Sequence, residues 1–231
     1  MLTLFHHPFC PHSRFIRLAL AEHGISDVRL IEERVWERRR EFLALNPACT
    51  TPVLLEEGHP AVPGAGIIAE YLDETRGAEL GDRRLLPTTV SERVEVRRLL
   101  SWFNDKFFAE VTGPLTNERL YKRYMPVGAG GGSPETEVIR TAHHNLRYHL
   151  AYIGWLARTR DWLAGDCMSY ADLAAATHLS AADYLGDVPW NEDEMAKTWY
   201  ARVKSRPSFR PLLAETLAGI SPSPTYADLD F

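Results

Sequence analysis

A proline stands directly before a short apolar run in the stretch Cys49-Thr50-Thr51-Pro52-Val53. Residues 37–45, which precede it, have the polar pattern of a helix that ends before Pro47, and residues 53–55 are typical of a strand. On its own, such a proline is most simply a trans residue that opens a strand. Whether it has a further role depends on the elements that surround it.

The surrounding segments predict a small α/β unit. Strand and helix patterns alternate along this part of the chain, with strands at residues 2–5, 28–31, 53–55 and 61–62 and helices at residues 15–20, 37–45 and 67–72. The order βαβαββα resembles the thioredoxin fold, and we assign it to residues 1–78. In that fold the proline at the position of Pro52 is cis and leaves the preceding backbone free to pair with an extended peptide.

The rest of the chain is predicted to be helical. After a polar connector at residues 80–87 the strand patterns stop, and helical patterns follow at residues 90–111, 135–160, 170–185 and 192–206. These patterns predict an all-α bundle over residues 88–220. Residues 221–231, which we call the tail, form a separate segment rich in proline and small hydroxyl residues. The predicted fold class is therefore α/β plus all-α.

The composition is that of a globular protein. The chain has 231 residues, of which 45% are hydrophobic and 25% charged, and this excludes wholesale disorder and a coiled coil. The net charge of -5 lacks the basic excess of a nucleic-acid-binding protein. No signal-peptide pattern is present, and no apolar run approaches the roughly 20 residues of a membrane span. We therefore expect a cytoplasmic protein without nucleic-acid partners or membrane insertion.

One cysteine lies at a predicted strand-to-helix junction, in the stretch Phe9-Cys10-Pro11-His12-Ser13-Arg14. Exposed backbone N–H groups and the helix dipole favour a thiolate at such a junction. The chain has three cysteines, too few for a disulfide-stabilised scaffold, so we expect free thiols. The alternative is that Cys10 is a loop cysteine without a role.

Residues 1–220 resemble a cytosolic glutathione transferase. The resemblance rests on the α/β unit, the turn Thr51-Pro52-Val53, the all-α second domain and the spacing Ser169-x-x-Asp172 before an apolar helix. It implies a homodimer with a glutathione site between the Cys10 turn, Pro52 and the turn after the fourth strand. In family members with the motif Cys-Pro-x-Ser, which here ends at Ser13, the cysteine forms mixed disulfides with glutathione.

The sequence departs from this family at the start of the third helix. Family members usually carry an acidic residue followed by serine there, and the serine hydroxyl and backbone N–H bind the γ-glutamyl carboxylate of glutathione. Gly64 and Ala65 occupy the matching positions. Loss of the hydroxyl costs roughly 1 to 3 kcal/mol, although backbone N–H groups at the helix start still favour an anion. We therefore expect a weakened glutathione site and no required cofactor.

Two features suit contact with a protein partner. The tail ends in an alternation of aromatic or apolar residues with acidic ones, namely Tyr226, Asp228, Leu229, Asp230 and Phe231. Trp36 stands among charged residues, as a binding anchor often does. Two alternatives remain open. The tail can pack back on its own bundle, and Trp36 can pack onto Phe42 or Leu43.

Two further patterns are interpreted as structural. Ser169 and Asp172 predict a helix capping box, in which loss of either partner costs on the order of 1 kcal/mol. The pairs His6-His7 and His143-His144 do not predict a metal site, because neither pair has a third ligand nearby in the sequence, and adjacent residues on a strand point to opposite faces.

Several stretches narrow the resemblance to a branch of the family that acts in bacterial division and binds the tubulin homologue FtsZ. They are residues 35–39, 183–190, 199–204 and 226–231, although Thr225 stands where we expect a histidine. The resemblance implies a dimeric, non-enzymatic scaffold at the division site that binds FtsZ filaments and links them to cell-wall synthesis. The alternative function is that of a glutathione-dependent thiol transferase with Cys10 as its nucleophile.

Overall fold

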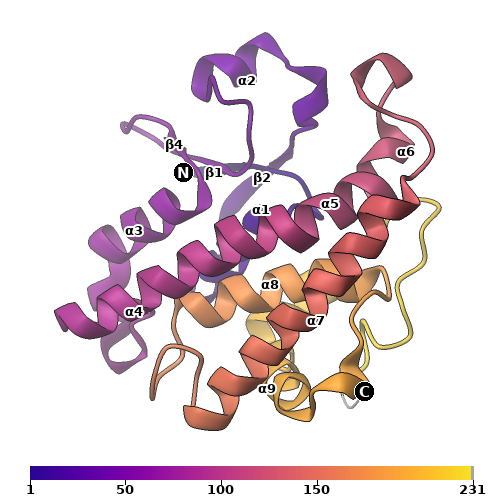
Figure 1. Cartoon of the computed structure of the whole chain (residues 1–231). Helices are drawn as coiled ribbons and strands as arrows, with labels where there is room; N and C mark the ends of the chain where they lie inside the picture. The colour runs from indigo at the N-terminus through magenta and orange to yellow at the C-terminus, as the bar shows by residue number, and fades with distance from the viewer. Residues whose placement is uncertain (230–231) are drawn as a thin grey trace.

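The computed structural model of the protein describes residues 1–229. Its N-terminal part contains a four-stranded sheet in the order β2-β1-β3-β4, with β1 at Leu2–His6, β2 at Val28–Glu32, β3 at Val53–Glu56 and β4 at Val62–Pro63. Strand β1 pairs parallel to β2 and antiparallel to β3, with Leu4 opposite Leu30 on one side and Leu54 on the other. Figure 1 shows this part in indigo and purple beside the helical part in magenta to yellow.

Three helices complete the N-terminal part and confirm the predicted order βαβαββα. They are α1 at Pro11–Glu22, α2 at Arg40–Leu45 and α3 at Ala65–Arg76. Helices α1 and α3 pack against each other and fill the core beside the sheet with fully buried side chains such as Phe15, Ile16 and Ile68. The Thr51–Pro52 peptide bond is cis, as the thioredoxin-like order predicts.

The first long helix of the second part extends further than the sequence indicates. Its pattern predicts an end at residue 111, but helical backbone continues without a break from α4 at Val90–Ser101 to α6 at Lys122–Tyr124. Two of the segments between them, η3 at Trp102–Thr112 and η4 at Asn117–Tyr121, are π-helical, and α5 at Gly113–Thr116 separates them. This long helical rod forms one wall of the cleft described below.

Four more helices complete the bundle: α7 at Thr136–Thr159, α8 at Tyr170–Tyr184, α9 at Glu194–Lys204 and α10 at Arg210–Leu213. Every residue of α8 is buried, and α8 packs against α1, so it is the central helix that joins the two parts of the chain (Figure 1). No helix among residues 1–229 is long and apolar enough to cross a membrane.

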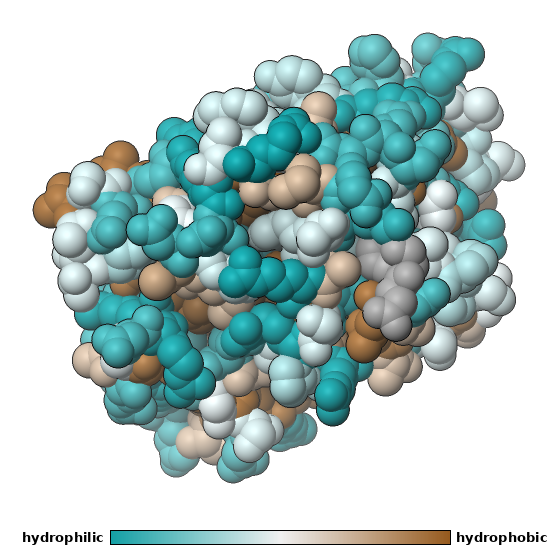
Figure 2. All heavy atoms as spheres, turned by 90° about the horizontal axis from the view of Figure 1, so that it is seen from below, coloured by the Kyte–Doolittle hydropathy of each residue, from teal (hydrophilic) through white to brown (hydrophobic). Residues whose placement is uncertain are grey.

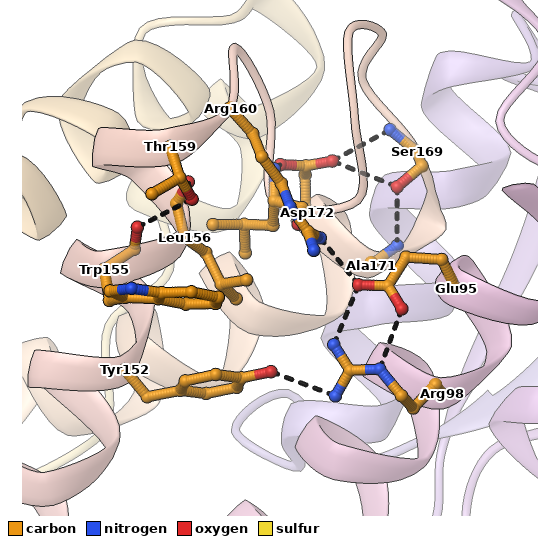
Figure 3. Close-up of polar contacts among 11 residues, drawn as sticks. Glu95, Arg98, Tyr152, Trp155, Leu156, Thr159, Arg160, Ser169, Ala171 and Asp172 are labelled. Carbon is orange, nitrogen blue, oxygen red and sulfur yellow. Dashed lines mark hydrogen bonds and ion pairs between the residues drawn. The ribbon is translucent and has the colours of Figure 1, made fainter.

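The predicted capping box starts α8. The Ala171 N–H donates to Ser169 Oγ at 3.2 Å, and the Ser169 N–H donates to the Asp172 carboxylate at 2.9 Å. Figure 3 shows this box next to a polar cluster that ties α4 to α7, in which Arg98 donates to both Glu95 and the Tyr152 hydroxyl. The box confirms the structural interpretation of Ser169 and Asp172.

Candidate functional site

A cleft of about 560 Å³ lies where the N-terminal part meets the long helical rod. The N-terminal part contributes the turn before α1, the segment before β3, and the start of α3. The rod contributes polar and aromatic side chains that no pattern in the sequence had singled out, namely Asn104, Asp105, Phe108 and Tyr121.

Cys10 is the N-cap residue of α1 and lies at the inner wall of the cleft. It is buried, and its sulfur lies 3.8 Å from the Thr51 carbonyl oxygen. Burial alone raises the pKa of a thiol, but hydrogen bonds with His12 and Ser13 and the charge of His12 outweigh it, so the pKa of Cys10 is lowered to about 7. A substantial fraction of Cys10 is therefore thiolate near neutral pH.

His12 is the residue that stabilises this thiolate, and the sequence alone did not indicate that role. Its Nε2 lies 2.8 Å from the Asn104 carbonyl oxygen. Because a carbonyl only accepts, Nε2 carries a proton and Nδ1 remains for Cys10. Burial lowers the pKa of His12, but the hydrogen bond and charge of Cys10, together with the bond to Asn104, outweigh it and raise the pKa above its usual value. The spacing Cys-Pro-His was the available signal, since it places both residues at the first turn of one helix.

The predicted cleft residues divide into two groups. Cys10, Thr51, Gly64 and Ala65 line the cleft. Ser13 is fully buried behind it, where its hydroxyl accepts a hydrogen bond from the His7 N–H at 3.3 Å. Pro52 also lies behind the lining, where its carbonyl accepts from the Gly64 N–H at 3.0 Å.

The start of α3 offers only part of a glutathione site. Gly64 is the N-cap residue with a φ of 93°, a backbone angle that favours glycine, and it provides no side-chain cap. Its N–H is already bonded to Pro52, whereas Ala65 and Gly66 present backbone at the first turn of the helix. The residues present therefore fit a carboxylate through backbone N–H groups, without the hydroxyl expected in this family.

Trp36 stands at the mouth of the cleft and is half-buried. Its ring contacts those of His7 and Tyr121, with centroids 5.7 and 5.6 Å away. The neighbouring Val35, and not Trp36, is among the partly buried residues that pack against the cluster of Phe42, Cys49 and Val53. Trp36 thus joins the N-terminal part to the long rod.

The tail is divided between a buried and an exposed portion. Tyr226 is fully buried beside Phe9 and Tyr184, which is the arrangement of the alternative in which the tail packs back on the bundle. The reason is that its ring completes an apolar cluster and its hydroxyl donates to the Leu212 carbonyl at 2.7 Å. Asp228 and Leu229 are exposed, and Asp230 and Phe231 lie outside the described residues.

Among residues 1–229, no group of three or more His, Cys, Asp or Glu side chains is arranged to hold a metal ion. His6 and His7 are buried, and burial lowers the pKa of His6 to about 3 and that of His7 to about 4. Both are therefore neutral at physiological pH. His143 instead lies 2.8 Å from the Asp187 carboxylate on the bundle.

The fold and the cleft define a class of protein, and comparison with known families agrees. Residues 9–75 match the family model "Glutathione S-transferase, N-terminal domain", and residues 95–207 match "Glutathione S-transferase, C-terminal domain". The chain belongs to the glutathione S-transferase family.

Within that family the chain is similar to a protein of bacterial origin. It is 46% identical over 99% of its length to FtsZ-localized protein A of Caulobacter vibrioides, and covers 98% of that protein. It is 26% identical to Glutathione S-transferase 2 of Saccharomyces cerevisiae, with 92% of this chain and 89% of that protein covered.

Comparison with solved structures gives the same family and the same similarity. A glutathione S-transferase from Sinorhizobium meliloti superposes with a TM-score of 0.97 at 53% identity, with both chains fully covered. FzlA from C. crescentus superposes with a TM-score of 0.90 at 45% identity, covering 100% of this chain and 99% of that chain. The arrangement of sheet, rod and bundle is thus common to these proteins.

Proposed function

We propose that this protein is a division protein on a glutathione-transferase fold that binds FtsZ filaments at the division site in the cytoplasm and links them to cell-wall synthesis. The observation that carries the proposal is the 46% identity to FtsZ-localized protein A over 99% of the chain. Identity of this extent covers both the cleft and the tail. It is the basis for transferring the partner that the name of that protein specifies.

The cleft supports a binding role over glutathione turnover. The start of α3 has neither a capping side chain nor a hydroxyl at Gly64 and Ala65. A site built around a hydrogen bond and then deprived of it loses about ten- to a hundredfold in affinity. The features that remain for a partner are the half-buried Trp36 at the cleft and the exposed residues 227–229 of the tail.

A homodimer would double this surface. Large apolar side chains remain exposed on three helices, with Ile67 on α3 61% exposed, Val94 on α4 58% and Trp155 on α7 50%. Exposed apolar groups of this kind favour association with a second copy. Two copies of a modest binding surface engage a repetitive filament with greater avidity than one.

Cosedimentation with FtsZ polymers tests the proposal. We expect the wild-type protein to pellet with polymers and to remain in the supernatant without them. Trp36→Ala should weaken binding about tenfold, as loss of an aromatic anchor does. Met195→Ala, which removes a partly exposed side chain on α9, is the control and should pellet like the wild type. Absence of pelleting by the folded wild-type protein would reject the proposal.

A second candidate function is glutathione-dependent thiol transfer. The observation that favours it is the lowered pKa of Cys10, about 7, produced by His12 in an open cleft. Calorimetry with glutathione decides between the two functions. Micromolar binding, together with disulfide exchange that Cys10→Ser abolishes, would support the transferase, whereas no heat at millimolar glutathione would exclude it.

A further inference from the structure

Two buried cations hold the tail. Lys204, at the end of α9, and Arg14, on α1, both have fully buried side chains. Cations with long side chains are rarely fully buried unless their charges and donors are satisfied. Each of these two side chains donates hydrogen bonds to the tail or to the backbone beneath it.

Lys204 fixes the backbone on both sides of Tyr226. Its Nζ donates to the Thr225 carbonyl at 2.5 Å and to the Asp228 carbonyl at 2.6 Å. Both acceptors are main-chain groups, so this ammonium determines the path of the chain over residues 225–228. The Asp183 carboxylate, 3.7 Å from Nζ and almost completely buried, supplies the opposite charge.

The end of α8 fixes the beginning of the tail. Ser223 donates its N–H to the Tyr184 carbonyl at 3.0 Å and its hydroxyl to the Asp183 carbonyl at 2.6 Å. The Thr225 hydroxyl donates to the Asp183 carboxylate at 2.7 Å. Thr225, which stands where we expect a histidine, therefore helps to hold the tail against α8.

Arg14 and the aromatic cluster hold the middle of the tail. The Arg14 guanidinium donates to the Tyr226 hydroxyl and, at 3.1 Å, to the Leu212 carbonyl. The Tyr226 ring meets that of Tyr184 nearly edge-on, with centroids 4.9 Å apart. Residue 226 therefore cannot leave its place without exposing a buried guanidinium and an aromatic cluster that includes Phe9.

We infer that the body of the protein holds the tail in one conformation and that the docking surface of the tail begins at Ala227. Lys204 is the residue that positions this surface. This inference rests on the proposed function. Ala227, Asp228 and Leu229 are exposed directly after the anchored turn, so an acidic and an apolar group stand at a defined place. Figure 2 shows one face of the molecule, on which apolar residues lie in small groups within a mostly hydrophilic surface.

Anchoring matters for affinity because ordering a free segment on binding costs free energy. A segment already held in its bound conformation avoids that cost. A partner complementary to this end presents an apolar recess for Leu229. On FtsZ filaments, loss of the anchor should therefore weaken binding even though no side chain of the docking surface has changed.

Lys204→Met tests the inference with two independent measurements. Hydrogen exchange of the backbone N–H groups of residues 223–229 reports the anchor, and cosedimentation with FtsZ polymers reports its effect on binding. We expect faster exchange confined to this segment and about tenfold weaker pelleting. Arg202→Met is the matched control on the same helix, because Arg202 lies over the Trp162 ring and donates to the Asp161 carbonyl.

Each outcome decides a separate part of the inference. Unchanged exchange in Lys204→Met would show that Lys204 does not hold the tail. Faster exchange with unchanged pelleting would show that positioning of the tail does not contribute to FtsZ binding. If Lys204→Met does not fold, Thr225→Val removes the hydroxyl contacts to Asp183 and Ser223 without touching Lys204, and it should show the same two effects at smaller size. If the wild type does not pellet, the proposed function fails together with the assignment of FtsZ as partner. The exchange measurement still shows whether Lys204 holds the tail.

Discussion

Cys10 and His12 show how one helical turn controls the chemistry of the cleft. The Asn104 carbonyl accepts the Nε2 proton of His12 at 2.8 Å and so directs the other ring nitrogen to the thiol. Each partner stabilises the charged form of the other, which lowers the pKa of Cys10 and raises that of His12. The Cys-Pro pair was evident in the sequence, but the contact with Asn104 depends on a helix almost a hundred residues away along the chain.

We predict that His12→Ala raises the pKa of the Cys10 thiol. Only the thiolate is alkylated, so the rate of alkylation by iodoacetamide should rise through pH 7 in the wild type and only at higher pH in the variant. Mass spectrometry distinguishes Cys10 from the exposed thiol of Cys167. An unchanged midpoint in the variant would show that His12 does not set the pKa.

The packing of the two aromatic residues proposed for partner binding was harder to predict from the sequence than the lining of the cleft. A sequence shows that Trp36 and Tyr226 are aromatic among charged neighbours, but not which of them finds an apolar cavity. Tyr226 lies in one beside Tyr184, whereas Val35, and not Trp36, packs against the cluster around Phe42. Such choices depend on long-range packing, which local composition does not encode.

At the scale of elements, the alternation of strands and helices and the capping box were predictable because both follow from local patterns. The length of the α4–α6 rod was not. Gly113 and Pro114 favour a break, yet the chain stays helical through them by adopting π-helical turns on either side. A Cβ on Gly113 would lie 2.8 Å from the Phe108 carbonyl oxygen, so the rod depends on a residue without a side chain at this point.

The capping box of α8 provides an element-scale prediction. Ser169→Ala should lower the free energy of unfolding by about 1 kcal/mol. Asp172→Ala should cost about 2 to 4 kcal/mol, since its buried carboxylate also accepts from the Leu163 N–H at 2.9 Å and the Trp199 indole at 3.0 Å. Urea denaturation measures both. Equal losses in the two variants would contradict the wider role of Asp172.

The contact between α7 and α9 provides a second prediction at the scale of elements. A Cβ on Gly154 would lie 2.1 Å from the carboxylate of Asp193, which caps α9 by accepting from the Met195 and Ala196 N–H groups. Gly154→Ala should therefore destabilise the protein by about 1 to 3 kcal/mol in thermal or urea unfolding. Gly128→Ala, where the added carbon meets open space, is the control. A stable Gly154→Ala would show that the two helices separate at little cost.

At the scale of the whole molecule, the proposed gain in avidity for a filament depends on two copies. We predict that light scattering after size exclusion gives twice the 26.2 kDa mass of one chain. Ile67→Glu/Val94→Glu, which places charges on two exposed apolar positions, should shift the mass toward that of the monomer. A wild-type monomer at micromolar concentration would contradict the proposed avidity of a dimer.

The central claim is that the protein acts through its outer surface and not through the chemistry of its cleft. The most direct test is cosedimentation with FtsZ polymers of two variants, Cys10→Ser and a chain that ends at Asp228, side by side with the wild type. We predict that Cys10→Ser pellets like the wild type and that the shortened chain, with its anchor intact, pellets poorly. Loss of pelleting in Cys10→Ser with full pelleting of the shortened chain would contradict the claim.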